Sequence, residues 1–529
     1  MNKTLKIILI CIATLLAVWA IGHMVIGRVA ENKVRKALAD IPGARIDFKD
    51  LEFSLAAGNL GLRDVEFELI DSTGKGPDIR ARIDAIKLEG VQWRSLFRGE
   101  ARAERLLIRK PETRLTLAQK TKGQKKEQKK EEVSAEASFL KHISLSELKI
   151  EKGKIGLESR GNAMKASAQG LGVSVRDIGF QLADGHLDFN DSSYFLTLDS
   201  LDFIDETGLN RIRIARLKTA DAGPVEALAM HIYNCVPMEQ VAERMGKVAA
   251  MWYDVQLDSL HTSSLNIPRM VESQRIEIEK IRLSGSKAVV FQDDRYPPAV
   301  PYPTLQEGVN TLKLPLKIQQ VDARFKSFSF IWETSHVNRG TIPMQNVQLG
   351  IRSVGNAPGN KMDLTLKSTL AGHGSLNLSV SVRNDKRETT SGKFHITDMD
   401  ASKLDDFVRP LFGATAKADI HQADGSFQGD KHQMKTEFCM LYDNLSVKAW
   451  KDASAPYSIV AKNSGAITFL ANLALPNSNP VSPKKEPKKA QFSFDRDPMV
   501  PYPAYLIQNL TLGMLHTVLP GATVRKNKK

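Results

Sequence analysis

Apolar residues recur along this chain with an unusual spacing. In residues 275–283 they stand at Ile276, Ile278, Ile281 and Leu283, at offsets of 0, 2, 5 and 7 positions. The same offsets recur in segments that begin at Ile46, Ile143, Leu196, Leu316 and Ile342. At about 100° per residue these positions fall on both sides of a helix, so they do not form an amphipathic helical face. They form two stretches of strand alternation separated by one extra residue.

An extra residue of this kind is typical of a β-bulge or corner, which bends a strand and returns its apolar side chains to one side. Tight turns between short strands would give the same offsets, and the pattern leaves that alternative open. Longer copies continue the pattern at offsets 12 and 14, with Ile155 and Leu157, Ala288 and Val290, and Phe328 and Phe330. Corners repeated at similar heights would curl a sheet lengthwise into a trough with an apolar wall.

We therefore expect a mainly β fold, in which an N-terminal transmembrane helix precedes an elongated, repetitive, curled β-sheet groove with a few short helices. A second repeat relates residues 63–69 to residues 176–182. Weaker copies of the bent pattern begin at Ala81, Ala101 and Ile212. The candidate residues of the groove wall are Val65, Phe67, Leu69, Ile178, Phe180, Leu182, Ile276, Ile278, Phe328 and Phe330.

Helical spacing is confined to a few segments. The best candidate is 237–255, with Val241, Met245 and Val248 at helical intervals. A shorter helix is predicted over 400–412, and an apolar one over 502–519. All three would pack against the sheet ends, and the last, which basic residues flank, could also touch a membrane.

The N-terminus predicts a membrane anchor. Residues 7–26 are 20 residues without a formal charge, enough to span roughly 30 Å of hydrocarbon as a helix. A cleavable signal peptide ending at Ala20 is the rival, but the apolar run continues past that point, which favours a retained anchor. Because no second such span follows, we expect the residues after about 29 to lie on one side of the membrane. The anchor residues are Ile7, Leu9, Leu15, Leu16, Val18 and Ile26.

Composition shifts divide the chain further. We predict an anchor over 1–28, then a β-rich segment over 29–118 with a short helical lead-in, and a charged linker over 119–138. The main β-groove body then covers 139–475, a polar insertion 476–490, and a C-terminal helix with a basic tail 491–529.

The charge distribution limits the expected binding partners, and the cysteine content limits the expected disulfides. Of a net charge of +14, part lies in runs at 122–132, 484–489 and 525–529, which are solvated linkers and tails or attract anionic lipid headgroups. No aromatic–basic motif or zinc-finger spacing accompanies them, so nucleic acid is not an expected partner. Three cysteines are too few for a disulfide framework. We expect Cys235 and Cys439 to be separate buried thiols, although an oxidising compartment would allow them to pair.

No catalytic motif stands out, because the chain lacks GxSxG, Walker A, GxGxxG and HExxH signatures. His421, Asp424, Asp430 and His432 crowd one stretch, where a polar hairpin is favoured over a metal site. Residues 398–400 carry two aspartates that are typical of a helix N-cap. We therefore expect a protein that is not an enzyme and needs no cofactor.

These blocks together resemble a known family. The anchor followed by IDFKDLEFSLAAGNLGLRDVEFEL (46–69) is similar to the start of the AsmA-like family of inner-membrane-anchored bacterial envelope proteins. ISLSELKIEKGKIGLES (143–159) resembles its recurring strand–strand unit. Residues 399–430, 440–450 and 471–480 resemble its C-terminal region, and the likeness covers about two thirds of the chain.

The resemblance implies a location and a role. Members of the family sit in the inner membrane as single-pass proteins, project into the periplasm, and build β-rich grooves lined with apolar residues. Larger relatives look like bridges that carry phospholipids toward the outer membrane and support its assembly, alone or with a bridging partner. The family brings no catalytic residues. The alternative is a non-catalytic envelope scaffold or assembly factor that binds a protein partner through an edge strand or the C-terminal helix.

Overall fold

The computed structural model falls into two compact units. Unit 1 comprises Met1–Ala229 with Asn266–Pro268, and unit 2 comprises Met230–Leu265 with Arg269–Lys529. The described residues are 44–54, 57–70, 76–92, 100–118, 142–181, 186–188, 193–221, 223–265, 273–334, 338–412, 414–449, 457–460, 476–518 and 523–526, with Arg35, Lys36, Leu38, Ser95 and Met270. The predicted anchor over 7–26 and the linker over 119–138 lie outside these residues. Within them, the structure contains no helix that is both long and apolar enough to cross a membrane.

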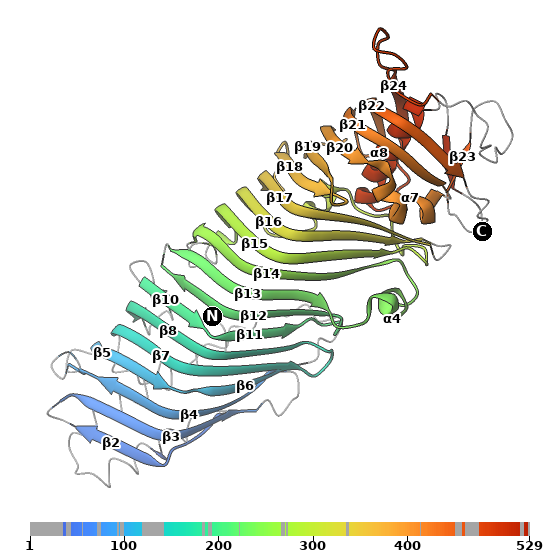
Figure 1. Ribbon diagram of the computed structural model, residues 1–529. Helices are drawn as coiled ribbons and strands as arrows, with labels where there is room; N and C mark the ends of the chain where they lie inside the picture. Colours follow the sequence, from blue (N-terminus) through green and yellow to red (C-terminus); the bar gives the residue numbers. More distant parts are fainter. Residues whose placement is uncertain are drawn as a thin grey trace. The chain divides into compact units, whose positions relative to one another are not determined.

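Unit 1 is built from strands that follow one another along a sheet (Figure 1). Its strands are β1 (Ala44–Asp47), β2 (Asp50–Ser54), β3 (Asn59–Leu69), β4 (Asp78–Glu89), β5 (Glu100–Arg109), β6 (Glu112–Leu117), β7 (His142–Ser159), β8 (Lys165–Gln181), β9 (His186–Asp188), β10 (Ser193–Leu198), β11 (Ser200–Ile204) and β12 (Asn210–Ala220). The pairs β5–β7 and β6–β7 are parallel, and the other pairings among β1–β12 are antiparallel. β13 (Pro224–Asn234) carries the chain into unit 2.

Unit 2 is also built from successive paired strands, and it contains several short helices and the longer helix α8. Its long strands are β14 (Ala250–Ser264), β15 (Ile276–Asp293), β16 (Leu316–Glu333), β17 (Arg339–Gly355), β18 (Lys361–Leu370), β19 (Gly374–Arg383), β20 (Thr390–Asp400), β21 (Ala414–Gly429), β22 (Gln433–Ala449) and β24 (Lys489–Asp495). β23 (Tyr457–Val460) pairs with β25 (Thr523–Lys526) in a separate two-stranded sheet. The helices are η1 (Met238–Gln240), α4 (Val241–Arg244), α6 (Leu305–Asn310), η2 (Ala401–Leu404), α7 (Asp405–Phe412) and α8 (Tyr502–Val518).

The repeated spacing marks bends within long strands. Leu145 pairs with Ile178 and Leu148 with Val175, so both strands carry the extra residue at the same height and the register does not slip. Asp177, the residue inside this corner, has φ 58°, a left-handed conformation that aspartate and asparagine adopt more readily than most residues. The expected mainly β fold with a curled sheet and few short helices is therefore confirmed.

The longest strands bend twice. β17 has left-handed residues at Asn346 (φ 52°) and Ser353 (φ 56°), and neither is paired with β16, which otherwise follows it in continuous register. The alternative of short strands also occurs, in the copies that begin at Ile46 and Leu196. There β1 and β2 both pair with β3, and β10 and β11 both pair with β12.

The helix predicted over 237–255 is wrong for most of its length. Only Met238–Arg244 is helical, and β14 begins at Ala250. Gly246 (φ 90°) and Lys247 (φ 60°) end the helix in left-handed conformations. The following residues pair along β15, so tertiary strand pairing overrides the local helical spacing. The helices predicted over 400–412 and 502–519 are confirmed as η2 with α7 and as α8.

Candidate functional site: one apolar face of the sheet

An unbroken row of apolar residues crosses the strands of unit 2. Each member lies directly opposite the next in the strand register. From β14 to β20 the row consists of Leu260, Leu283, Ala323, Leu349, Leu366, Leu378 and Phe394. A neighbouring row contains Ile281, Val321, Ile351, Leu364 and Val380. Because each corner returns the side chains to the same face, these rows form one continuous apolar surface.

Unit 1 has a row of the same kind. From β2 to β10 it consists of Leu51, Leu62, Ile86, Ile108, Ile150, Val173 and Leu196. Leu62 is buried against Phe48, Val65 and the helical residue Leu38. The later members, from Ile86 to Leu196, are only half-buried. Along this row the apolar face of unit 1 is closed at β3 and more open from β4 onward, whereas Leu88 of β4 and Leu106 of β5 beside it are buried.

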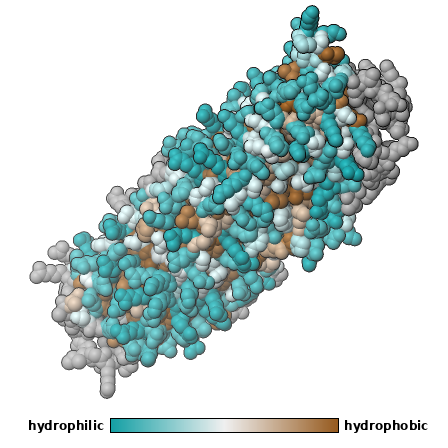
Figure 2. Space-filling model, in the orientation of Figure 1, coloured by the Kyte–Doolittle hydropathy of each residue, from teal (hydrophilic) through white to brown (hydrophobic). Residues whose placement is uncertain are grey.

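The opposite face of the strands carries charge. Arg105 of β5 donates to Glu147 of β7 at 2.7 Å, and Lys154 of β7 lies 2.6 Å from Glu112 of β6. In unit 2, Lys280 lies 2.9 Å from Asp322. The hydrogen bond from Arg105 lowers the pKa of the Glu147 carboxyl. Exposed pairs of this kind add little stability, so their main effect is to keep this face in water. Figure 2 shows a molecular face that is mostly hydrophilic, with hydrophobic atoms between the polar ones.

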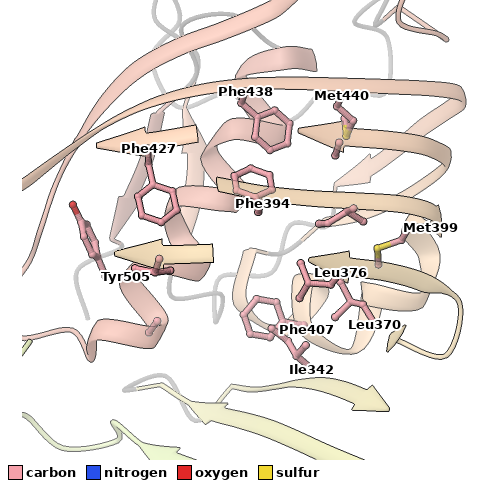
Figure 3. Packing of buried hydrophobic residues seen from close by; sticks show 14 of the residues in the cluster. Ile342, Leu370, Leu376, Phe394, Met399, Phe407, Phe427, Phe438, Met440 and Tyr505 are labelled. Atoms are coloured by element: carbon pink, nitrogen blue, oxygen red, sulfur yellow. The ribbon is translucent and has the colours of Figure 1, made fainter. Parts of the chain in front are cut away.

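A large closed cluster covers the apolar face in the C-terminal strands (Figure 3). Side chains from β16 to β22 and from β24 meet residues of α7 and α8, among them Phe407 and Tyr505. Two glycines make room for aromatic rings, because a Cβ at Gly425 would lie 1.9 Å from Cζ of Phe394 and one at Gly392 would lie 2.2 Å from Cζ of Phe427. This part of the face is a core of interlocking side chains.

The predicted wall residues fall into different environments. Phe67, Leu69, Ile178, Ile276 and Ile278 are half-buried, and Ile276 and Ile278 lie opposite Leu316 and Ile318. Val65 is 2% exposed in the N-terminal cluster, and Phe330 is 7% exposed in the C-terminal cluster, against which Phe328 also packs. The Phe180 backbone pairs opposite Ile143. Leu182 lies outside the described residues.

Sequence reasoning missed a buried polar group between β15 and β16. The carboxylate of Asp294 accepts hydrogen bonds from Trp332 Nε1 at 2.7 Å, Tyr302 Oη at 2.9 Å and Gln292 Nε2 at 2.8 Å. Burial raises the pKa of Asp294, and the carboxylate of Asp293 raises it further. A repeated VPYP sequence at 300–303 and 500–503 was the available signal. The first copy contacts the residues just before the second, since the amide of Tyr302 donates to the carbonyl of Pro498 at 2.9 Å.

The polar stretch at 421–432 is divided among separate contacts. His421 Nε2 lies 2.9 Å from Asp443 Oδ2, whereas Asp424 Oδ1 lies 2.6 Å from His395 Nδ1. Asp430 accepts from the amide of His432 in the β21–β22 turn, as a polar hairpin requires. Among the described residues, no three His, Cys, Asp or Glu side chains are grouped so that they could hold a metal ion.

Two cysteines and a polar cleft lie apart from the apolar rows. Cys235 and Cys439 are both free. The expectation that both are buried is wrong, because Cys235 is exposed after the end of β13 and Cys439 is only half-buried. An open cleft of about 890 Å³ lies on the polar face of β19–β24. Serine hydroxyls line it together with Lys393, Lys435 and Glu437. It is separate from the apolar rows, which face the other way in the same strands.

No protein-family model matches the chain, and no curated protein matches it.

Proposed function

We propose that the apolar face of the sheet binds the acyl chains of phospholipids, and that the protein conducts these lipids between membranes in support of outer-membrane assembly. We propose with it that the chain is an AsmA-like envelope protein, anchored once in the bacterial inner membrane by residues 7–26 with its bulk in the periplasm. The observation that carries the proposal is the apolar row from Leu260 to Leu349, which is half-buried except at Ala323 and continues from strand to strand without a polar break.

The physical argument rests on the hydrophobic effect. Each CH₂ group of an acyl chain that leaves water for such a surface gains about 0.8 kcal/mol. Because neighbouring strands repeat the same apolar positions, a chain that shifts by one strand spacing of about 4.8 Å exchanges equivalent contacts. Binding is then favourable while movement along the face meets low barriers. The charged opposite face would stay in water.

The alternative is a non-catalytic scaffold that binds a protein partner. The closed cluster under α7 and α8 favours it for the C-terminal strands, because that core leaves no apolar surface for a ligand. The half-buried rows of β14–β16 and β4–β12 favour the lipid proposal. The two alternatives predict different behaviour toward lipid.

Charge substitutions test the proposal. The full chain is incubated with vesicles containing a fluorescent phospholipid, and lipid extracted onto the protein is measured. Leu196→Glu in unit 1 and Leu283→Glu in unit 2, both members of the apolar rows, should each lower extraction several-fold. Gln169→Glu in β8 and Gln348→Glu in β17 add the same charge at exposed positions and should leave extraction unchanged. Equal extraction by all four variants and the unaltered chain would reject the apolar face as the binding surface.

A further inference from the structure

The apolar rows of unit 2 change from half-buried to buried as they cross the sheet. Leu260 of β14 and Leu283 of β15 are half-buried. In the same row, Phe394 of β20 is 3% exposed, and Phe438 of β22 is 2% exposed. The strand register connects these positions without interruption through Gly425. The change in burial therefore comes from what lies over the face, since the strands and their side-chain pattern continue.

Helix α8 lies over β22 and β24 with a close fit. A Cβ at Gly513 would stand 2.4 Å from Cδ2 of Phe438, so the helix backbone approaches the ring directly. Thr436 Oγ1 donates to Asn509 Oδ1 at 2.9 Å, and both residues are buried. Tyr505 Oη donates to the carbonyl of Phe494 at 2.9 Å. Polar groups on the buried side of α8 thus have partners on the strands, which makes this a formed interface.

Two other elements complete the cover. Phe407 of α7 is buried in the same cluster as Ile342 of β17 and Leu376 of β19 (Figure 3). The segment 294–304 leads from the end of β15 to Thr304, the N-cap of α6, and contacts the turn before α8 through the hydrogen bond from Tyr302 to Pro498. Within it, Tyr302 donates to Asp294 through its hydroxyl and accepts a bond of 2.6 Å from Arg496 through its carbonyl. These contacts hold Tyr302 between the end of β15 and the residues that precede α8.

We infer that acyl chains in unit 2 occupy only the apolar face of β14, β15, the first half of β16 and the adjoining second half of β17, because Phe330 in the other half of β16 lies in the closed cluster. Helices α7 and α8 form a plug over the face from the second half of β16 to β24, and the segment 294–304 contacts the turn before α8. This inference rests on the proposed function and deepens it by assigning the part of the face that is the site. A lipid advancing under the plug as far as β22 would have to separate α8 from β22 and expose Thr436 and Asn509 without partners. The path in unit 2 therefore ends at the plug.

Photolabelling tests this inference on the unaltered chain. Full-length protein is incubated with vesicles that contain a phosphatidylglycerol with a diazirine in its acyl chain, irradiated and digested. We expect labelled peptides from β14, β15 and β16, and none from β19, β20 or the first half of β22. Equal labelling of β20 and β22 would overturn the plug and leave the lipid proposal standing. No label on any strand would contradict the proposed function itself, and the inference with it.

A variant of α8 makes the test sharper. Gly513→Leu places a side chain against Phe438, and we expect it to loosen α8 and extend labelling onto β20 and β22. Thr511→Ala removes only a hydroxyl that bonds within the helix, to Ile507, and should leave the labelling unchanged. Hydrogen exchange of the α8 amides reports whether the helix has opened. An opened helix with labelling still confined to β14–β16 would overturn the plug.

Discussion

Ile281 of β15 lies directly opposite Val321 of β16 in a parallel pair. The two residues hold the same place in two copies of one apolar spacing, and the registered pairs of the two strands keep a constant offset from Ile276 and Leu316 to Asp293 and Glu333. The offsets 0, 2, 5 and 7 read the same in both chain directions. Parallel and antiparallel neighbours therefore place their corners at the same height, which explains why the chain reuses this spacing.

The corners depend on left-handed residues, and Asn346 tests this. Asn346→Val should destabilise unit 2 by about 1–2 kcal/mol, because a branched side chain in this conformation clashes with its own backbone. Asn346→Gly should be close to neutral, since glycine adopts positive φ freely. Urea denaturation midpoints of the two variants measure the difference. Equal midpoints for valine and glycine would mean that the corner does not need this conformation.

The aromatic rings over glycines give a second prediction. Gly425→Ala puts a methyl group into the ring of Phe394, and the core should lose about 1–3 kcal/mol through overpacking. Gly308→Ala in α6 is the matched control, because a Cβ there meets nothing within 4 Å. Alanine should stabilise that helix by about 0.5–1 kcal/mol. Thermal unfolding compares the two, and equal effects would argue against ring-over-glycine packing.

The buried carboxyl of Asp294 predicts a pH dependence. Its pKa in the folded chain is raised above 3.8 by burial and by Asp293, so the folded state binds this proton more tightly than the unfolded state does. Its contribution is fully present below about pH 3.8 and is lost as pH rises through the folded-state pKa. The side chain of Asp294→Asn does not titrate. The difference in unfolding free energy between this variant and the unaltered chain should therefore shift in favour of the variant as the pH rises from 4 to 7.

Denaturation midpoints at several pH values measure this effect. Asp258→Asn is the control, because Asp258 is an exposed carboxylate of β14. Stability curves of the unaltered chain and Asp294→Asn that stay parallel across the range would contradict a raised pKa at Asp294.

The sequence was enough to predict the strands, their bends and their common apolar face. Period-two alternation with one extra residue is a local property, so a single sequence is enough to recognise it. A second local signal marks the corners themselves, because an aspartate or asparagine directly precedes an apolar residue there. It occurs at Asp64, Asp177, Asn346, Asp398 and Asn444, all with positive φ. The N-cap pattern predicted from residues 398–400 therefore applies only to Asp400, which caps η2, whereas Asp398 is a corner residue.

The extent of the open face could not be read from the sequence. Ile278 and Phe330 both belong to the repeated apolar pattern, at offsets 2 and 14. Ile278 is half-buried, whereas Phe330 lies in a closed cluster. The difference comes from α7 and α8, which are distant in sequence from β16 and whose docking depends on fits such as Gly513 against Phe438. Burial of this kind is a tertiary property, so periodicity alone cannot assign it.

The most direct test of the central claim is the lipid content of the full chain after purification. Protein extracted from bacterial membranes is exchanged into a lipid-free detergent, and retained phospholipid is counted by mass spectrometry against a single-pass membrane protein with a soluble β domain. An open apolar face predicts several phospholipids per chain above the control. Control-level lipid on a folded chain would contradict the account and favour the scaffold alternative.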